Sequence, residues 1–272
     1  MPSLRSLKAR INSVNSTYKV TSAMKTVAMS KFNLASSHYA KYEAYYNACG
    51  EILDSLGGAG RFLPKGEGTG RKCYVLITSN RGLCGSYNTE LLRYFKESVL
   101  SKGDKIIVCG KWAASRLGDG AENVTVSDVP SYQETEALFE KLAGLYESGE
   151  ADEVSFVYQD YVNMLTHAPK VERLFPTDSG QGKSGGDIIY LPDRSEVAES
   201  ALLLCLRSKV YGIMLKAATG AQAATLVAMR TASDNSEAML RELEQTLNRM
   251  RQAMVTTEVI EVSSASSEKQ NK

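Results

Sequence analysis

One short motif of this chain has residue types that could bind phosphate. Gly182-Lys183-Ser184 matches the end of a phosphate-binding loop, in which backbone amides and a lysine hold the phosphate groups. Thr177 occupies the position of that motif's first glycine, and no strand–loop–helix pattern surrounds the segment. We therefore expect a solvated linker here rather than a nucleotide site.

A second motif places a cysteine between glycines, in Gly82-Leu83-Cys84-Gly85, directly after an apolar strand-like run. A thiol on such a tight turn could act as a nucleophile if a general base lay beside it. His38 and His167 are the chain's two histidines, and neither has a context that suggests this partnership. We expect Cys84 to be a buried packing residue.

The remaining candidate ligands indicate neither a metal site nor a disulfide framework. Two histidines far apart in the sequence do not form a zinc motif. An odd number of cysteines without a CxxC pair is typical of reduced thiols in an intracellular compartment; they are Cys49, Cys73, Cys84, Cys109 and Cys205. We predict no cofactor and no metal.

Charge is balanced overall but unevenly distributed. The net charge of +1 over 272 residues gives no general attraction to nucleic acid or membrane, and no apolar run approaches the ~18 residues of a membrane span. Residues 1–42 contain no acid, which favours an acidic partner over nucleic acid, because aromatic and arginine interleaving is lacking. Residues 1–30 also fit a mitochondrial transit peptide. The lysines and arginines of residues 1–42 are Arg5, Lys8, Arg10, Lys19, Lys25, Lys31 and Lys41.

Both ends of the chain lack helix breakers. After Pro2 the next proline is Pro64, and none follows Pro192. Proline-free stretches can remain helical throughout, so each end could form a helix of roughly 50–60 residues, far above the usual length of about 11–12. A rod of that length cannot be buried by a compact domain of this size, and its natural partner is the other rod.

The apolar spacing in both ends agrees with such a pairing, because steps of three and four residues define a coiled-coil seam. The N-terminal seam comprises Leu4, Leu7, Ile11, Val14 and Tyr18, continued after a small phase shift by Met24, Val27, Ala28, Phe32, Ala35 and Tyr39. The C-terminal seam comprises Leu240, Leu243, Leu247, Met250, Met254 and Thr257. We predict a long antiparallel two-helix coiled coil within one chain. The alternative is two separate amphipathic helices on a globular core.

The middle of the chain predicts a small α/β domain with parallel strand pairs, because strand-like runs alternate with helical patterns. The expected strands are residues 73–78, 106–109, 154–158 and 188–191, and the expected helices are 89–100 and 135–147. The predicted organisation is an N-terminal helix over 1–58, an α/β domain over 71–194, a C-terminal helix over 195–262 and a polar, frayed tail over 263–272.

Three segments together resemble the gamma subunit of F-type ATP synthases, in order and spacing from Leu4 to about Val262. They are Lys19 with Val20-Thr-Ser-Ala-Met-Lys-Thr-Val-Ala-Met-Ser-Lys31; Ile77-Thr-Ser-Asn-Arg-Gly-Leu-Cys-Gly-Ser-Tyr-Asn88; and Ala232-Ser-Asp-Asn235 followed by Leu247-Asn-Arg-Met-Arg-Gln-Ala-Met-Val-Thr-Thr-Glu258.

This resemblance implies a non-catalytic rotor subunit without a cofactor. The coiled coil would form the shaft inside a ring of three alpha and three beta subunits. A small Rossmann-like α/β domain would lie outside that ring and meet epsilon-type and delta-type subunits and the c-ring. The implied location is the matrix side of the mitochondrial inner membrane or, alternatively, the cytoplasmic side of a bacterial plasma membrane. Only partners would contact the membrane.

The resemblance also implies partner-contact residues. Arg81 matches a family arginine that pairs with beta subunits, while Arg251 and Gln252 match a pair that binds a beta loop, with Thr256 one turn further on. The resemblance places four other contacts on the N-terminal helix. There, Met24 and Lys25 would pass an acidic loop of beta, and Arg10 and Lys19 belong to the same basic rod.

Some positions depart from the family pattern. Many relatives have Asp at the position of Asn80 and Arg at that of Thr225, and the chloroplast cysteine insert is lacking. Two other functions remain open: a coiled-coil adaptor that presents an α/β domain, and a small α/β enzyme whose helical arms dimerise. A homodimer without partners would favour the adaptor, and activity that survives removal of the arms would favour the enzyme.

Overall fold

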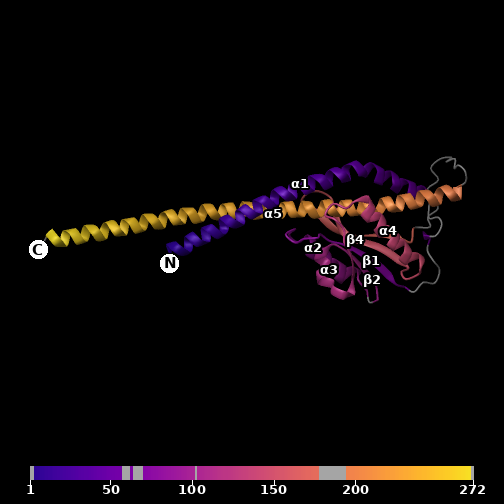
Figure 1. Ribbon diagram of the computed structural model, residues 1–272, viewed down its shortest axis with the longest axis horizontal. Coiled ribbons are helices and arrows are strands. Elements are labelled where there is room, and N and C mark those ends of the chain that lie inside the picture. Colours follow the sequence, from indigo (N-terminus) through magenta and orange to yellow (C-terminus); the bar gives the residue numbers. More distant parts are fainter. Residues whose placement is uncertain (1–2, 57–61, 64–69, 102, 178–193, 271–272) are drawn as a thin grey trace. The chain divides into compact units, whose positions relative to one another are not determined.

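The computed structural model describes residues 3–56, 62–63, 70–101, 103–177 and 194–270. The chain begins with helix α1, Leu4–Leu56, of 53 residues, and ends with helix α5, Arg194–Gln270, of 77 residues (Figure 1). The predicted long helix at each end is therefore confirmed. Side chains beyond residue 263 lie outside the described part, so the frayed tail over 263–272 stays a prediction.

Between these helices lies a five-stranded sheet with the order β3-β2-β1-β4-β5. The sequence predicted parallel strand pairs in general, and the β1–β2, β1–β4 and β2–β3 pairs are parallel, whereas β5 pairs with β4 in the antiparallel sense. The sheet is therefore mixed. The strands are β1 Lys72–Ile77, β2 Lys105–Cys109, β3 Glu122–Val124, β4 Glu153–Tyr161 and β5 His167–Phe175.

Shorter helices connect the strands. Helix α4 begins with a capping box, because the Ser131 hydroxyl accepts from the Glu134 amide while the Glu134 carboxylate accepts from the Ser131 amide. The strand expected at 188–191 lies outside the described residues, and β3, β5 and α3 were not predicted. The helical elements are α2 Tyr87–Tyr94, the π-helical turn η2 Phe95–Val99, α3 Lys111–Leu117, the 3₁₀ turn η3 Gly118–Gly120 and α4 Tyr132–Glu147.

Apolar side chains bury the sheet on both faces, which explains the nearly continuous apolar runs of its parallel strands. One core cluster joins strand residues such as Val75 to Leu142 of α4 and Ile213 of α5. The other cluster joins Leu76 and its neighbours to Leu91 of α2.

The chain forms two compact units. The sheet unit comprises residues 28–228, and the helix-pair unit comprises residues 1–27 and 229–272. Each therefore contains part of α1 and part of α5.

Within the sheet unit, α1 and α5 are antiparallel, because contacts later along α1 lie earlier along α5. Phe32 shares a cluster with Ala223 and Leu226. Ten residues on, the Tyr42 hydroxyl bonds the Ser208 hydroxyl at 2.7 Å, and its ring packs edge-on against Tyr211. Gly212 allows this approach, since a Cβ there would lie 2.2 Å from a ring carbon of Tyr46.

Within the helix-pair unit, buried and half-buried residues repeat at steps of three and four on both helices. On α1 they include Leu4, Leu7, Ile11, Val14 and Tyr18, and on α5 they include Met229, Ser233, Ser236, Leu240, Leu243, Leu247 and Met250.

Residues 251–263 of α5 are all exposed, and Figure 1 shows α5 running on past the start of α1. The predicted seam was therefore wrong at Met254 and Thr257, where α5 has no neighbouring helix. It was also wrong at Val27, which is 56% exposed because the repeat passes through Ala28 instead.

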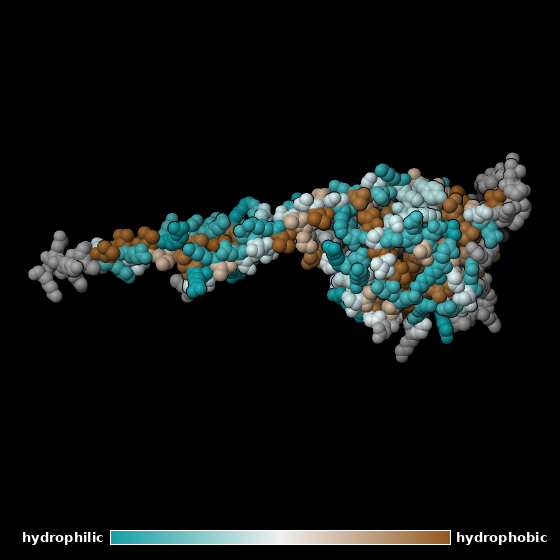
Figure 2. Space-filling model, viewed as in Figure 1, coloured by the Kyte–Doolittle hydropathy of each residue, from teal (hydrophilic) through white to brown (hydrophobic). Residues whose placement is uncertain are grey.

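In Figure 2 hydrophobic residues are visible on the surface of this last part of α5. Across the described residues, no helix has an apolar stretch long enough for a bilayer crossing.

Candidate partner-contact site

The loop after β1, residues 78–86, presents Arg81 to solvent. We call this segment the Arg81 loop. It turns through left-handed backbone at Leu83, with φ of 65°, and at Gly85, with φ of 60°. Positive φ is rare for a bulky residue such as leucine, and such strain concentrates at functional sites. The Leu83 side chain is nevertheless 57% exposed.

Asn88 holds this loop from inside. Its side-chain oxygen accepts the Ser79 amide at 3.1 Å, and its amide donates to the Ser79 hydroxyl at 2.6 Å and to Cys84 Sγ at 3.2 Å. Asn88 is only 1% exposed, and a buried amide that satisfies several partners fixes their relative positions. The Ser79 hydroxyl in turn donates to the Arg81 carbonyl, so the backbone at Arg81 is held in place.

Cys84 is a packing residue in this arrangement. It is 3% exposed and shares a cluster with Tyr87, Ala221 and Ala224. Its sulfur accepts from Asn88, and this agrees with the structural role that the sequence predicted rather than with a nucleophile.

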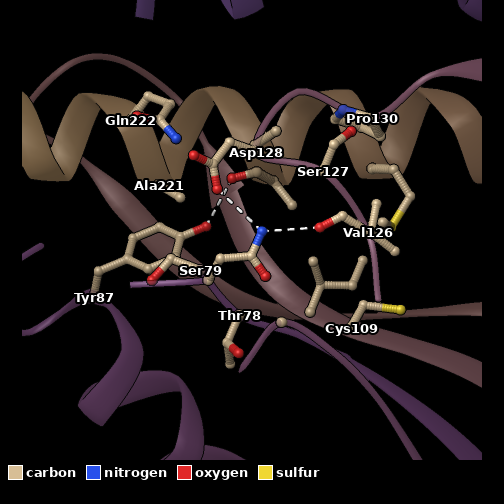
Figure 3. Close-up of a pocket in the computed structure, with 16 residues that line it drawn as sticks. Thr78, Ser79, Tyr87, Cys109, Val126, Ser127, Asp128, Pro130, Ala221 and Gln222 are labelled. Atoms are coloured by element: carbon tan, nitrogen blue, oxygen red, sulfur yellow. Dashed lines mark hydrogen bonds between the residues drawn. The ribbon is translucent and has the colours of Figure 1, made fainter. Parts of the chain in front are cut away.

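Asn80 connects the same loop to the chain after β3. Its side-chain amide donates to the Val126 carbonyl at 2.8 Å and to Asp128 Oδ1 at 3.0 Å (Figure 3). Its side-chain oxygen accepts the Lys111 amide at 3.3 Å, which adds the start of α3. Lys31 of α1 forms an ion pair with the other oxygen of Asp128.

These contacts determine the charge state of Asp128. Burial alone would raise the pKa of its carboxyl, but hydrogen bonds from Lys31 and Asn80 and the positive charges of Lys31 and Arg81 outweigh burial. The pKa of Asp128 is therefore held below its ordinary value, and the group is ionised at neutral pH.

A small cavity lies beside these residues, at the carboxyl ends of β1 and β2 and against α5 (Figure 3). Its volume is about 40 Å³, far below the roughly 300–1,000 Å³ of small-molecule sites. Its polar lining includes Thr78, Ser79, Asn80, Asp128 and Gln222. The described residues contain no group of three His, Cys, Asp or Glu side chains that could hold a metal ion. The Gly182-Lys183-Ser184 motif lies outside them.

The other predicted contact residues belong to the helix-pair unit. Arg251, Gln252 and Thr256 are exposed on neighbouring turns of α5, where the Thr256 hydroxyl donates to the Gln252 carbonyl at 2.9 Å.

On α1 of the same unit, Arg10 and Lys19 are exposed, while Met24 and Lys25 are half-buried. The structure thus brings the three α5 residues together, and Arg81 lies in the sheet unit.

Sequence reasoning missed the residues that support Arg81. Asp128 stands alone between Val126 and Pro130, and no motif there indicates that it meets Lys31 across 97 positions of sequence. Asn88 lies within the recognised motif, but its burial could not be inferred from residue type.

The fold and site together define a class of protein in which two long terminal helices flank an α/β domain that presents an arginine loop. A family model described as ATP synthase matches residues 3–267. The ATP synthase gamma chain of Desulfitobacterium hafniense is 30% identical over 273 residues, covering 96% of this chain and 97% of that one. The gamma chain of Chlorobium luteolum is 32% identical over 287 residues, covering 96% and 97%. The chain belongs to the ATP synthase gamma family.

Solved structures agree on the fold. The rotor of the Euglena gracilis mitochondrial ATP synthase aligns with a TM-score of 0.66 at 18% identity, covering 93% of this chain and 98% of that one. The central stalk and c-ring structure from Tetrahymena thermophila gives a TM-score of 0.61 at 21% identity, covering 79% and 99%.

Proposed function

We propose that this chain is the central rotating shaft of a proton-translocating F-type ATP synthase. In this role it couples rotation of the c-ring to conformational change in catalytic beta subunits and catalyses no reaction itself. The observation that supports this most strongly is the antiparallel packing of α1 and α5 within one chain, followed by an α5 end with every described side chain from 251 to 263 exposed.

The shaft is proposed to be an antiparallel coiled coil. On each helix of the helix-pair unit, one series of buried and half-buried positions follows steps of three and four residues, the period of a coiled-coil seam. A two-helix shaft has no threefold symmetry. Inside a ring of three identical beta subunits it would present a different face to each, and each would favour a different conformation.

Eight residues are proposed to contact partners. An arginine side chain binds a carboxylate through two parallel hydrogen bonds, which makes Arg81 and Arg251 suited to acidic loops of the ring. Both side chains are exposed, so partners can reach them. The remaining proposed contacts are Arg10, Lys19, Met24, Lys25, Gln252 and Thr256.

The α/β domain is proposed to meet epsilon-type and delta-type subunits and the c-ring, so that only partners link the chain to the membrane. The relatives named above are bacterial and the solved structures mitochondrial, and both locations fit. A bacterial plasma membrane, cytoplasmic side, and a mitochondrial inner membrane, matrix side, are the two proposals.

Co-purification tests this function against the adaptor alternative. With an affinity tag on this chain, we expect a complex with three alpha and three beta copies for each copy of the chain. A stable homodimer without those partners would contradict the rotor and favour an adaptor that dimerises through its helices.

The contact residues have their own test. Replacing Arg251 and Gln252 together by alanine should lower ATP turnover or coupling in the complex, while the helix content of the chain is unchanged because both side chains are exposed. Thr246→Ala, an exposed residue one and a half turns earlier, is the matched control. Unchanged turnover and coupling in the double variant would remove this contact from the proposal.

A further inference from the structure

Three segments far apart in the sequence meet at one carboxylate in the sheet unit. Asp128 follows β3, Asn80 follows β1, and Lys31 lies on α1; we call these three residues the Asp128 junction. Oδ2 of Asp128 pairs with the Lys31 ammonium, and Oδ1 accepts the Asn80 amide at 3.0 Å. The junction therefore joins the long N-terminal helix to the loops at the carboxyl edge of the sheet.

The junction is partly shielded from water, with side chains 34% exposed at Lys31 and 26% at Asp128. Charge-assisted hydrogen bonds in such surroundings are stronger than those on an open surface. Asp128 satisfies a different partner with each oxygen. Removing its charge would leave Lys31 without its anion and Asn80 with a weaker acceptor.

Arg81 directly follows Asn80, so the junction acts on the backbone that presents it. Asn88 fixes the inner side of the Arg81 loop to α2, whereas Asn80 fixes the same loop to Asp128 and, through it, to α1. The first set of contacts determines the loop's shape. The second determines where the loop stands relative to α1.

We propose that Asp128 is a positioning residue that fixes the Arg81 loop to α1 and so sets where Arg81 meets an acidic partner. The fixing of the loop is a property of the chain alone. Its consequence for partner contact rests on the proposed function.

The first experiment measures amide hydrogen exchange in the full chain by mass spectrometry. In Asp128→Asn and in Lys31→Met, exchange over residues 78–86 should become about tenfold faster, while exchange within β1 and β2 is unchanged. Lys105→Met is the matched control, because it removes another ion pair of the sheet unit, with Glu150 at 3.0 Å, that does not reach this loop. Unchanged loop exchange in Asp128→Asn, or equal acceleration in the control, would overturn the proposal.

A charge reversal separates positioning from general destabilisation. Lys31→Asp combined with Asp128→Lys restores opposite charges in the same place. The Asn80 amide loses its acceptor at position 128 but keeps its bonds to the Val126 carbonyl and the Lys111 amide. We expect the pair to recover the part of the loop protection that depends on the ion pair and that each single reversal loses. Double-variant exchange as fast as that of the single variants would contradict an ion-pair mechanism.

The second experiment uses the assembled complex and measures ATP-driven proton pumping per ATP hydrolysed. Asp128→Asn and Arg81→Ala should each lower this ratio, and the double variant should be no worse than Arg81→Ala, because one residue acts through the other. Additive losses would overturn the link to Arg81. If no complex assembles with the wild-type chain, the proposed function fails, while the exchange experiment still decides whether Asp128 fixes the loop.

Discussion

Helix α5 has different surroundings in the two units. In the sheet unit, Ile213 and Met214 pack into the sheet core, while Ser208 and Tyr211 meet α1 on another side of the same helix. In the helix-pair unit only one stripe of α5 is buried or half-buried, and every described side chain from 251 to 263 is exposed. The number of neighbours around the helix, rather than its helical propensity, therefore determines which side chains contribute to stability.

Substitutions in the packed and in the exposed parts of the long helices should therefore have different effects, and we call this difference the division. Where α5 touches both the sheet and α1, substitutions should mainly change folding stability. Where α5 is exposed, they should leave stability unchanged and act only through partners.

The largest effect is expected at the carboxyl edge of the sheet. Gly110 has φ of 118°, and a Cβ there would lie 2.2 Å from the backbone oxygen of Thr78, which cannot move without disturbing β1. Gly110→Ala should lower the free energy of unfolding by about 3 kcal/mol or more. Denaturant unfolding measures this loss.

Gly118→Ala is the matched control for that substitution. Gly118 also has positive φ, 59°, but a Cβ there would meet nothing within 4 Å. It should lose less, about 1–3 kcal/mol, from backbone strain alone. Equal losses in the two variants would show that the close approach to Thr78 does not matter.

The next effect distinguishes paired from unpaired helix. Leu7 of α1 is 5% exposed, so Leu7→Ala should destabilise the helix-pair unit by about 2–3 kcal/mol. Val259 of α5 is 62% exposed, and Val259→Ala should change stability by no more than about 0.5 kcal/mol. Thermal loss of helical circular dichroism compares the two; similar shifts would contradict the division.

A third prediction concerns pH and the packing of helices against β5. Glu172 bonds the Tyr158 hydroxyl at 2.8 Å and pairs with Lys170 at 3.0 Å and Lys209 at 3.5 Å. Burial alone would raise the pKa of Glu172, but the charge of Lys209, the Tyr158 hydrogen bond and Lys170 outweigh it and hold the pKa below its ordinary value.

A carboxyl whose folded-state pKa is lowered stabilises the fold above its unfolded pKa, ~4.3 for glutamate, and this stabilisation is lost as pH falls through the folded value. Unfolding free energy should therefore fall below about pH 4.3, and Glu172→Gln should flatten that fall. Glu122→Gln, a surface ion-pair partner of Lys141, is the control. An unchanged pH slope in Glu172→Gln would rule out this contribution.

The smallest effect tests one hydrogen bond between α2 and α5. The buried Tyr87 hydroxyl donates to the Ala217 carbonyl at 2.9 Å. Tyr87→Phe should cost about 1 kcal/mol, because the carbonyl loses its additional donor. Tyr94→Phe, on the same helix and half-buried, should cost less. Urea midpoints that do not differ would show that this bond contributes nothing.

The sequence predicted the parts of the fold that depend on local pattern. Both long helices were predicted from the absence of proline, and strands β1, β2 and β4 were predicted from their apolar runs. Strand β5 was missed because it is an edge strand with mostly partly exposed residues, including Pro169 and Lys170, so it lacks a continuous apolar run. Strand β3 has only three residues, too few to form a pattern.

The candidate site likewise has one part that the sequence predicted and another that it could not. Arg81 was identified from its motif, and its exposure agrees with a partner contact. The residues that hold the Arg81 loop could not be found from the sequence, because the contact between Lys31 and Asp128 depends on how α1 packs beside the sheet. Met254 and Thr257 follow the coiled-coil spacing although no helix packs beside them. The spacing identifies one face of a helix, but it does not show whether another helix covers that face.

Single-molecule observation of the assembled complex would show whether this chain rotates inside the ring. The complex would be fixed by its beta subunits, and a probe would be attached to a cysteine introduced at the exposed Lys96 of the sheet unit. During ATP hydrolysis we predict rotation of this chain in one direction, with three stops per revolution, one for each beta subunit. ATP hydrolysis by the assembled complex without rotation of the probe would contradict the account.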